Sequence, residues 1–421
     1  LKLLTIILEK SQLFSGRTKS YLPQMTAGFL LATLVSLPVC AEDWPQWLGP
    51  DGSNRVQGDG FLPDLEKYKI AWEKQIGLGY ASITVAGGKA FAMGHDQEGN
   101  ETVYCLDASS GKELWHRSYK AELLPRMHKG GPNASPTIDG DRVFTLSKDG
   151  RLYSLKVADG SVNWEANLVD IFGIKVPSWG FASSPVLRDG RIFVSSGKVA
   201  ALDASNGEKL WVSSEAYHPG YTTPVVFKHG ATEYVAAMDG KGLSILTSRD
   251  GVEVSRHPTK AQFDMQATTP VILEDGSQIF IAGNMTSELL AFDGASLKSK
   301  WKTREIKNAM NNSVIVGDVI YGIDGKQGSR NARLVAVNLD SGELIWSRDG
   351  FGYGNTIGVG GHILSLSETG ELAVSGMDKS AFKEFSRRKV LESTCWTTPV
   401  FANQRIYVRN DLGHLICLSK S

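Results

Sequence analysis

The chain has few cysteines and no excess of either charge. Four cysteines stand among 421 residues, and none has the Cys-x-x-Cys spacing of ribbon-type zinc sites and c-type haem attachment. The 45 Lys and Arg residues balance 45 Asp and Glu residues, so no net field favours nucleic acid or an anionic membrane. The eight histidines are scattered without metal-ligand spacing. We therefore expect no disulfide framework, no nucleic-acid partner and no metal site.

Long hydrophobic runs are also scarce, and one stretch stands out, AGFLLATLVSLPV at residues 27–39. It follows basic residues, is short for a transmembrane helix, and has the length of a signal-peptide core. We predict a signal peptide at residues 1–41, cleaved after Ala41. Acylation of Cys40 is the alternative, although the residues before it are larger than a lipoprotein signal prefers. Because no second such run follows, we expect an exported chain, periplasmic or secreted, without a transmembrane span.

Glycine, by contrast, is abundant, at 45 residues, and many of these glycines belong to a repeat. The segment LDASSGKELW at 106–115 returns as LDASNGEKLW at 202–211. Weaker copies stand at 155–164, 291–301 and 337–346. Upstream of these repeats lies a small hydroxyl anchor, usually followed by Pro and Val. The anchors are Ser82, Ser135, Ser184, Thr223, Thr269, Ser313, Thr356 and Thr398.

The anchors recur roughly every 40 to 53 residues, with room for four short strands in each unit. That period is typical of a β-propeller. The sequence therefore predicts an all-β, eight-bladed propeller over residues 69–421, preceded by a lead-in segment at 42–68 and forming a single domain. We expect a monomer.

The repeat indicates structure rather than catalysis. Its glycine suits a turn that requires positive φ, and its tryptophan can pack between neighbouring blades. The tryptophans expected in this role are Trp72, Trp115, Trp164, Trp211, Trp301 and Trp346. Trp72 lies in KIAWEKQIG, residues 69–77, which we expect to supply the outer strand that the last blade lacks. That strand would close the ring and remove an open sheet edge.

Closure also predicts the state of two thiols. Cys105 and Cys417 occupy the same register in the first and last blades, which closure makes neighbours. Equivalent positions in stacked sheets lie about 10 Å apart, whereas a disulfide needs Cα atoms within about 7 Å. We expect two buried free thiols rather than a bridge.

The spacing D-x-x-x-G-x-x-x-W, found within 106–115 and 202–211, resembles the tryptophan-docking motif A-x-D-x-x-x-G-x-x-x-W of the pyrroloquinoline quinone (PQQ) repeat propellers. The opening DWPQWLGPDGSNRV at 43–56 is similar to the start of quinoprotein dehydrogenases. The resemblance implies the propeller fold and two possible branches. One holds PQQ-dependent dehydrogenases, and the other holds non-enzymatic propellers typified by the lipoprotein of the outer-membrane β-barrel assembly machinery.

Departures from the enzyme pattern favour the non-enzymatic branch. Quinoprotein alcohol dehydrogenases carry adjacent cysteines and a cluster of Ca²⁺ ligands, and this sequence has no Cys-Cys pair and no compact acidic cluster. We therefore assign no catalytic residue and expect no cofactor, with PQQ and calcium as an alternative that no motif supports. The expected function is a scaffold that binds a protein or small ligand. A shortened PQQ-dependent oxidoreductase and an extracellular carbohydrate-acting enzyme are the other hypotheses.

The central funnel is the expected binding site. Residues two before each anchor, with their neighbours, should surround one mouth of it and either plug the channel or hold a ligand. The candidates are Tyr80, Asn133, Trp179, Tyr221, Gln266, Asn311, Tyr353, Asn355 and Trp396. Two long connections are further candidates. The connection at 118–133 contains a local basic cluster, and the connection at 167–181 is apolar and either docks a partner or packs over the mouth.

Overall fold

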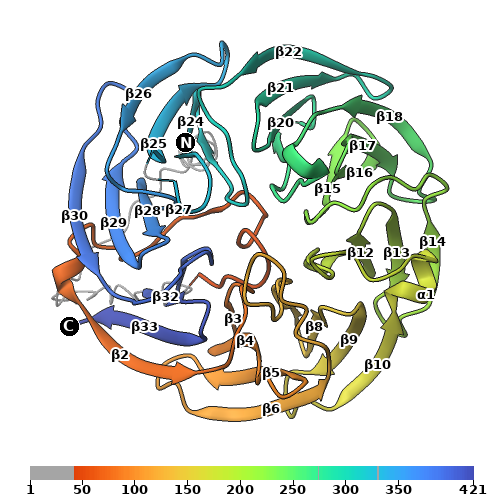
Figure 1. Ribbon diagram of the computed structural model, residues 1–421, viewed down its shortest axis with the longest axis horizontal. Coiled ribbons are helices and arrows are strands. Elements are labelled where there is room, and N and C mark those ends of the chain that lie inside the picture. The colour runs from red at the N-terminus through yellow and green to blue at the C-terminus, as the bar shows by residue number, and fades with distance from the viewer. Residues whose placement is uncertain (1–41, 274, 330) are drawn as a thin grey trace, which may run out of the picture. The chain divides into compact units, whose positions relative to one another are not determined.

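The computed structural model describes residues 42–273, 275–329 and 331–421 (Figure 1). These residues form eight sheets arranged in a ring, each with four antiparallel strands at its core, consecutive along the chain in every sheet but one. The predicted eight-bladed propeller is confirmed. The proposed signal peptide and Cys40 lie outside the described residues.

The blades are numbered in chain order, and their strands run from the centre outward. Blade 1 has β3 (Thr84–Ala86), β4 (Lys89–His95), β5 (Asn100–Asp107) and β6 (Glu113–Lys120). Blade 2 has β7 (Thr137–Asp139), β8 (Arg142–Leu146), β9 (Arg151–Lys156) and β10 (Val162–Asn167). Blade 3 has β11 (Val186–Arg188), β12 (Arg191–Ser195), β13 (Val199–Asp203) and β14 (Lys209–Val212). Blade 4 has β15 (Val225–His229), β16 (Thr232–Asp239), β17 (Gly242–Thr247) and β18 (Glu253–Pro258).

Blade 5 has β19 (Val271–Leu273), β20 (Gln278–Ala282), β21 (Ser287–Phe292) and β22 (Leu297–Thr303). Blade 6 has β23 (Val314–Val316), β24 (Val319–Asp324), β25 (Arg333–Asn338) and β26 (Leu344–Arg348). Blade 7 has β27 (Gly354–Val359), β28 (His362–Ser367), β29 (Glu371–Gly376) and β30 (Glu384–Lys389). Blade 8 has β31 (Val400–Ala402), β32 (Arg405–Arg409), β33 (His414–Lys420) and β2 (Tyr68–Gln75). The described helices are short, namely η1 (Leu65–Lys67), α1 (Leu168–Phe172) and η2 (Gln262–Asp264).

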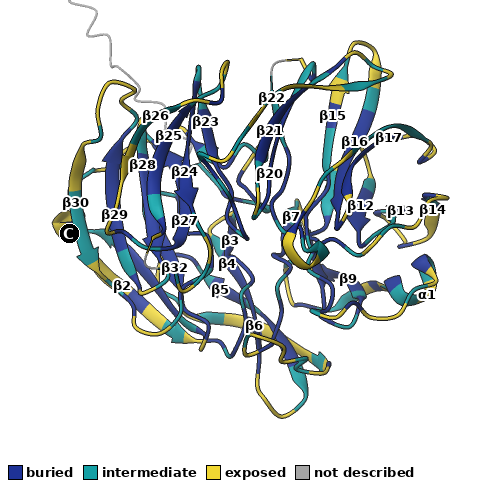
Figure 2. Cartoon of the chain, turned by 45° about the horizontal axis from the view of Figure 1, so that its top comes forward, coloured by how far each residue is buried: buried dark blue, intermediate teal, exposed yellow. Residues whose placement is uncertain are grey.

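The middle strands of each blade are buried on both faces, while the outer strands expose one face (Figure 2). Strand β24 is buried along its whole length, whereas β22 has three exposed lysines and no fully buried residue. Both faces of a middle strand pack against neighbouring blades, so continuous apolar runs are stable there. The hydrophobic core therefore lies between the blades.

Tryptophan side chains lie at six of the eight seams between blades. The indole Nε1 of each predicted docking tryptophan donates to a turn carbonyl of the next blade at 2.8–3.1 Å. At the seam between blades 4 and 5, where the repeat has no tryptophan, the Tyr234 hydroxyl donates to the Gly294 carbonyl at 3.2 Å. At the seam between blades 7 and 8, Phe61 packs edge-on against Phe401. Aromatic packing therefore continues around the ring although the motif does not.

An N-terminal strand closes the ring, as predicted. Strand β2 pairs antiparallel with β33, with Trp72 opposite Cys417. The fully buried Arg409 of blade 8 donates to the carbonyls of Met93 and Gly77, at 2.7 and 3.0 Å, and so joins the last blade to the start of the first. Cys105, Cys395 and Cys417 are buried and free. The prediction for Cys105 and Cys417 is therefore confirmed.

The lead-in segment crosses the ring on the face that carries the turns between the first two strands of the blades. Trp44 pairs with Val85 of blade 1, and the indole of Trp47 donates to Thr269 Oγ1 of blade 5 at 3.0 Å. Strand β1 (Arg55–Val56) then adds in parallel to β27 of blade 7. This role was not predicted from the sequence, although two tryptophans outside the repeat pattern were its available signal.

Candidate functional site

The hydroxyl anchors of blades 8, 1, 2, 3 and 4 are joined by hydrogen bonds, which form a belt along part of the centre of the ring. The backbone N–H of Ser82 donates to Ser135 Oγ at 2.9 Å, and that of Ser135 donates to Ser184 Oγ at 2.9 Å. The N–H of Ser184 donates to Thr223 Oγ1 at 3.0 Å. Ser82 Oγ also donates to the Thr398 carbonyl across the closure, at 3.0 Å. This belt fixes the inner ends of the blades, and with them the residues of the funnel mouth.

Five of the nine predicted mouth residues remain partly accessible, on blades 8, 1, 2, 3 and 4. Tyr80 stacks on Trp396 with ring centroids 5.6 Å apart, and His128 meets the edge of Tyr80 at 5.2 Å. Trp179 meets Tyr221 edge to face at 5.3 Å. Asn133 donates to the Trp179 carbonyl at 3.4 Å. We call Tyr80, His128, Trp179, Tyr221 and Trp396 the aromatic arc.

The other four predicted mouth residues are buried. The Tyr353 hydroxyl donates to Asn311 Oδ1 at 3.4 Å, and Asn355 Nδ2 donates to the Trp396 carbonyl at 2.8 Å. Gln266 is 2 % exposed, and its Nε2 donates to Thr259 Oγ1 at 3.3 Å. The structure therefore places the predicted residues at two depths, an accessible arc and a buried layer that supports blades 5 to 7.

Burial keeps the titratable members of the arc neutral. Burial raises the pKa of Tyr80 to about 12 despite the hydrogen bond from the Lys129 N–H. Burial, assisted by the nearby charge of Lys148, lowers the pKa of His128 to about 4. The arc at neutral pH therefore offers uncharged aromatic faces, with the Arg126 guanidinium 5.7 Å from the Trp179 ring. Such a surface suits stacking and desolvated contacts rather than proton transfer.

The two long connections differ in what they expose. In the connection at 118–133, Met127 is 84 % exposed and has a φ of 58°. In the connection at 167–181, Leu168, Phe172 and Phe181 are buried in a core cluster. This apolar connection therefore packs mostly inward, and among its large apolar residues Val176 remains exposed.

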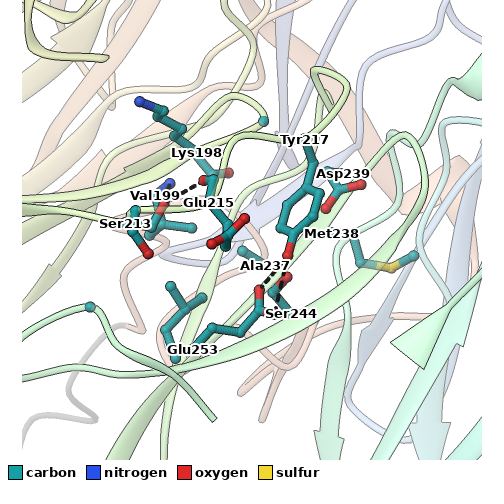
Figure 3. A pocket seen from close by; sticks show the side chains of 15 residues that line it. Lys198, Val199, Ser213, Glu215, Tyr217, Ala237, Met238, Asp239, Ser244 and Glu253 are labelled. Carbon is teal, nitrogen blue, oxygen red and sulfur yellow. Dashed lines mark hydrogen bonds between the residues drawn. The ribbon is translucent and has the colours of Figure 1, made fainter. Parts of the chain in front are cut away.

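A cleft between blades 3 and 4 was not predicted from the sequence (Figure 3). It encloses about 360 Å³, part of it open to solvent. The Tyr217 hydroxyl donates to both Glu253 carboxylate oxygens at 3.1 Å. Arg256 lies 3.4 Å from the Tyr217 ring centre and donates to both Asp239 oxygens, at 2.7 and 2.9 Å. These polar groups satisfy one another, and the early end of β14 leaves the opening beside them.

The described residues offer neither a metal-binding cluster nor a spanning helix. No three His, Cys, Asp or Glu side chains in the described part of the chain are grouped so that they could hold a metal ion. No helix among residues 42–273, 275–329 and 331–421 is long and apolar enough to cross a membrane.

Comparison with known proteins identifies the family. A family model described as outer membrane protein assembly factor BamB matches residues 69–171 and 99–348, and so spans more than half of the chain. The chain belongs to this BamB family of PQQ-like propellers. The assembly factor BamB of Yersinia pestis is 24% identical over 375 residues, which cover 83% of this chain and 88% of that protein.

Solved structures agree on the fold. BamB from Moraxella catarrhalis superposes with a TM-score of 0.60 at 17% identity, covering 84% of this chain and 97% of that one. A quinohemoprotein alcohol dehydrogenase from Comamonas testosteroni superposes with a TM-score of 0.67 at 12% identity, covering 90% of this chain and 81% of that one. The fold is thus common to both branches. The predicted resemblance to PQQ-repeat propellers is confirmed.

Proposed function

We propose that this protein is a periplasmic scaffold of the BamB type, which takes part in outer membrane protein assembly by docking a protein partner. The match to the BamB family model over residues 69–348 supports a part in outer membrane protein assembly. The partner would bind the face that carries the connections between successive blades. We call it the loop face.

The observation that carries the proposal is the exposure of large apolar side chains on the loop face. Phe263 is 71 % exposed and Met127 is 84 % exposed, and each lies in a connection from the outer strand of one blade to the inner strand of the next. These connections repeat around the ring, so they lie on the same face. Exposed apolar side chains of this size are costly in water and favour a protein contact.

The local structure holds Phe263 in its exposed position. Its φ is 61° and that of Asp264 is 51°, a region that non-glycine residues seldom occupy. The Gln262 N–H donates to Asn284 Oδ1 at 2.9 Å, and Asn284 Nδ2 donates back to the Gln262 carbonyl at 3.4 Å. Met285 follows in the second loop and is also exposed. The two linked loops therefore present Phe263 and Met285 on a supported backbone, and strain of this kind is often found at binding sites.

A deletion strain tests the proposal. The gene would be removed from the source organism and restored as wild type, as Phe263→Asp or as Val252→Asp. Val252 is an exposed residue of the same blade in the turn before β18, on the opposite face, and serves as the matched control. We expect outer membrane protein levels to fall in the deletion strain and to recover with wild type and V252D but not with F263D.

Two results would contradict the proposal. Unchanged outer membrane protein levels in the deletion strain would show that the protein has no part in outer membrane protein assembly. Full rescue by F263D would show that Phe263 on the loop face does not dock the partner. Immunoblotting and thermal unfolding of each variant ensure that a failed rescue does not reflect lost protein.

A further inference from the structure

The side chain of a buried lysine at the loop face has no hydrogen-bond partner among the described residues. Lys148 lies in the turn between β8 and β9, and its side chain is 0 % exposed. Its backbone N–H donates to Glu101 Oε1 at 3.2 Å, but no described residue hydrogen-bonds or ion-pairs with its Nζ. A buried ammonium without a partner is strongly unfavourable. Such a group indicates that something outside the chain completes its environment.

No acidic side chain of the described residues forms a hydrogen bond or ion pair with the Lys148 ammonium, although the Glu101 carboxyl group lies nearby. Burial raises the pKa of Glu101 to about 8, so that carboxyl group is largely protonated at neutral pH, and the Tyr119 hydroxyl lies 3.3 Å from its Oε2. Asp149 points to Arg151 instead, at 3.5 Å. Burial lowers the pKa of Lys148 itself to about 7. When charged, the lysine is therefore left without a hydrogen-bonded anion and would be stabilised by one.

Lys148 lies beneath the aromatic arc. A Cβ on Gly180, next to Trp179, would stand 2.5 Å from Lys148 Cγ, so this turn rests on the lysine stem. His128, which meets the edge of Tyr80, is close enough for the lysine charge to contribute to its lowered pKa. Lys148 therefore lies next to two parts of the aromatic arc, His128 on one side and, through Gly180, the turn that carries Trp179 on the other.

The segment 121–131 lies beside Lys148, because His128 is close enough for the lysine charge to act on it. Beyond Ala121, it is held to other parts of the chain by the Lys129–Asp411 ion pair at 3.0 Å, by the Trp179 indole, which donates to the Arg126 carbonyl at 3.1 Å, and by the Lys129 N–H, which donates to the Tyr80 hydroxyl at 3.2 Å. Leu124 and Met127, neither of them glycine, have φ of 48° and 58°. A strained loop backbone opens at lower cost than a strand.

We propose that Lys148 anchors a binding site for a small, flat carboxylate, which displaces His128 and lies against the rings of Tyr80 and Trp179. The ammonium supplies the charge-assisted hydrogen bond to the carboxylate, and the rings supply the stacking faces. The site goes beyond the proposed scaffold function and does not depend on it, because no protein partner takes part.

The test is a calorimetric titration of the full chain with sodium benzoate, the simplest flat carboxylate, at neutral pH. We compare wild type with Lys148→Met, His128→Ala and the control Lys198→Met, a lysine in the equivalent hairpin of blade 3. We expect saturable binding to wild type, binding weakened at least about tenfold in K148M, unchanged binding in K198M and tighter binding in H128A, where the covering side chain is gone. Because K148M removes an unpaired buried charge, it should fold at least as stably as wild type.

Three outcomes would overturn the proposal. They are no saturable benzoate binding to wild type and H128A, equal binding to K148M and wild type, and inorganic phosphate binding as tightly as benzoate. The last result would show a compact anion site in which the rings have no part. Loss of protein docking in the deletion experiment would leave all three measurements unaffected.

Discussion

The contact between Gly160 and Trp115 makes a quantitative prediction about how one blade seals the next. Gly160 has a φ of 71°, and a Cβ there would lie 2.6 Å from Cε3 of the Trp115 ring. Gly160→Ala therefore imposes two costs. The left-handed backbone costs a non-glycine residue about 1–2 kcal/mol, and displacing a packed ring costs about 1–3 kcal/mol. We expect the free energy of unfolding to fall by about 2–5 kcal/mol in total.

Gly140 separates the two costs, because it lies in the same blade with a φ of 57° and has no atom within 4 Å of the position that a Cβ would take. Gly140→Ala should lower the free energy of unfolding by the backbone cost alone, about 1–2 kcal/mol. Trp115→Ala removes the ring and should cost about 3–5 kcal/mol. In that background Gly160→Ala should cost no more than Gly140→Ala, which leaves a coupling energy of about 1–3 kcal/mol between Gly160 and Trp115.

Equilibrium unfolding in urea measures all of these free energies, with far-ultraviolet circular dichroism and tryptophan fluorescence followed together. Coincident transitions and an unchanged m-value would license the comparison. The reasoning is refuted if Gly160→Ala costs no more than Gly140→Ala in the wild-type background, or if the Gly160 and Trp115 substitutions are additive. Either result would mean that the repeated Gly and Trp do not act as a pair.

Burial and the ligand set lead to three further predictions. The Lys148→Met variant should be more stable than wild type. Because the lysine pKa falls from 10.5 to about 7 on folding, the buried charge destabilises the wild-type fold fully below pH 7. The difference in unfolding free energy between variant and wild type should therefore narrow as pH rises from 7 towards 10.5. A gap independent of pH would refute this. Burial raises the pKa of the Cys105, Cys395 and Cys417 thiols to about 12, so peptide mapping should find them unmodified by iodoacetamide in the native state and alkylated in denaturant. Alkylation in the native state would show that the ring opens. Titration with PQQ and Ca²⁺ should give no dye-linked alcohol oxidation, since no Cys-Cys pair is present; saturable binding with turnover would instead make the chain a minimal quinoprotein.

The ring could be predicted from the sequence because its interactions are local and repeated. The anchor hydroxyls of Ser135, Ser184 and Thr223 each accept from the N–H of the preceding anchor, so a small hydroxyl residue recurs at the same step. The closing strand was also predictable, since the last repeat ends one strand short and Trp72 supplies the missing docking residue. Residues that make the same contact at successive seams recur at a regular spacing in the sequence, and this spacing predicts the number of blades.

The depth of the mouth residues could not be predicted in the same way. Tyr80 and Tyr353 stand near equivalent anchors, yet one is partly accessible and the other is fully buried. The two rings contact different connections: the Tyr80 hydroxyl accepts from the Lys129 N–H of the connection before blade 2 at 3.2 Å, whereas the Tyr353 hydroxyl accepts from the Met310 N–H of the connection before blade 6 at 3.1 Å. Connection lengths and paths are not repeated, so the pattern of anchors carries no information about them.

The seam between blades 4 and 5 keeps the repeated strand arrangement but is packed by residues that do not belong to the repeat. Ser255 stands where other blades have tryptophan, and its hydroxyl accepts from the Leu297 N–H at 3.1 Å. The aromatic volume comes instead from Tyr234, whose ring meets Phe292 at 5.1 Å and 90°. The connection that presents Phe263 leaves this same seam. At this seam the packing does not depend on the repeated glycine and tryptophan. Among the seams of the described ring, it is the one at which a tyrosine in place of a tryptophan donates to the neighbouring turn, and the connection that carries the exposed Phe263 begins here.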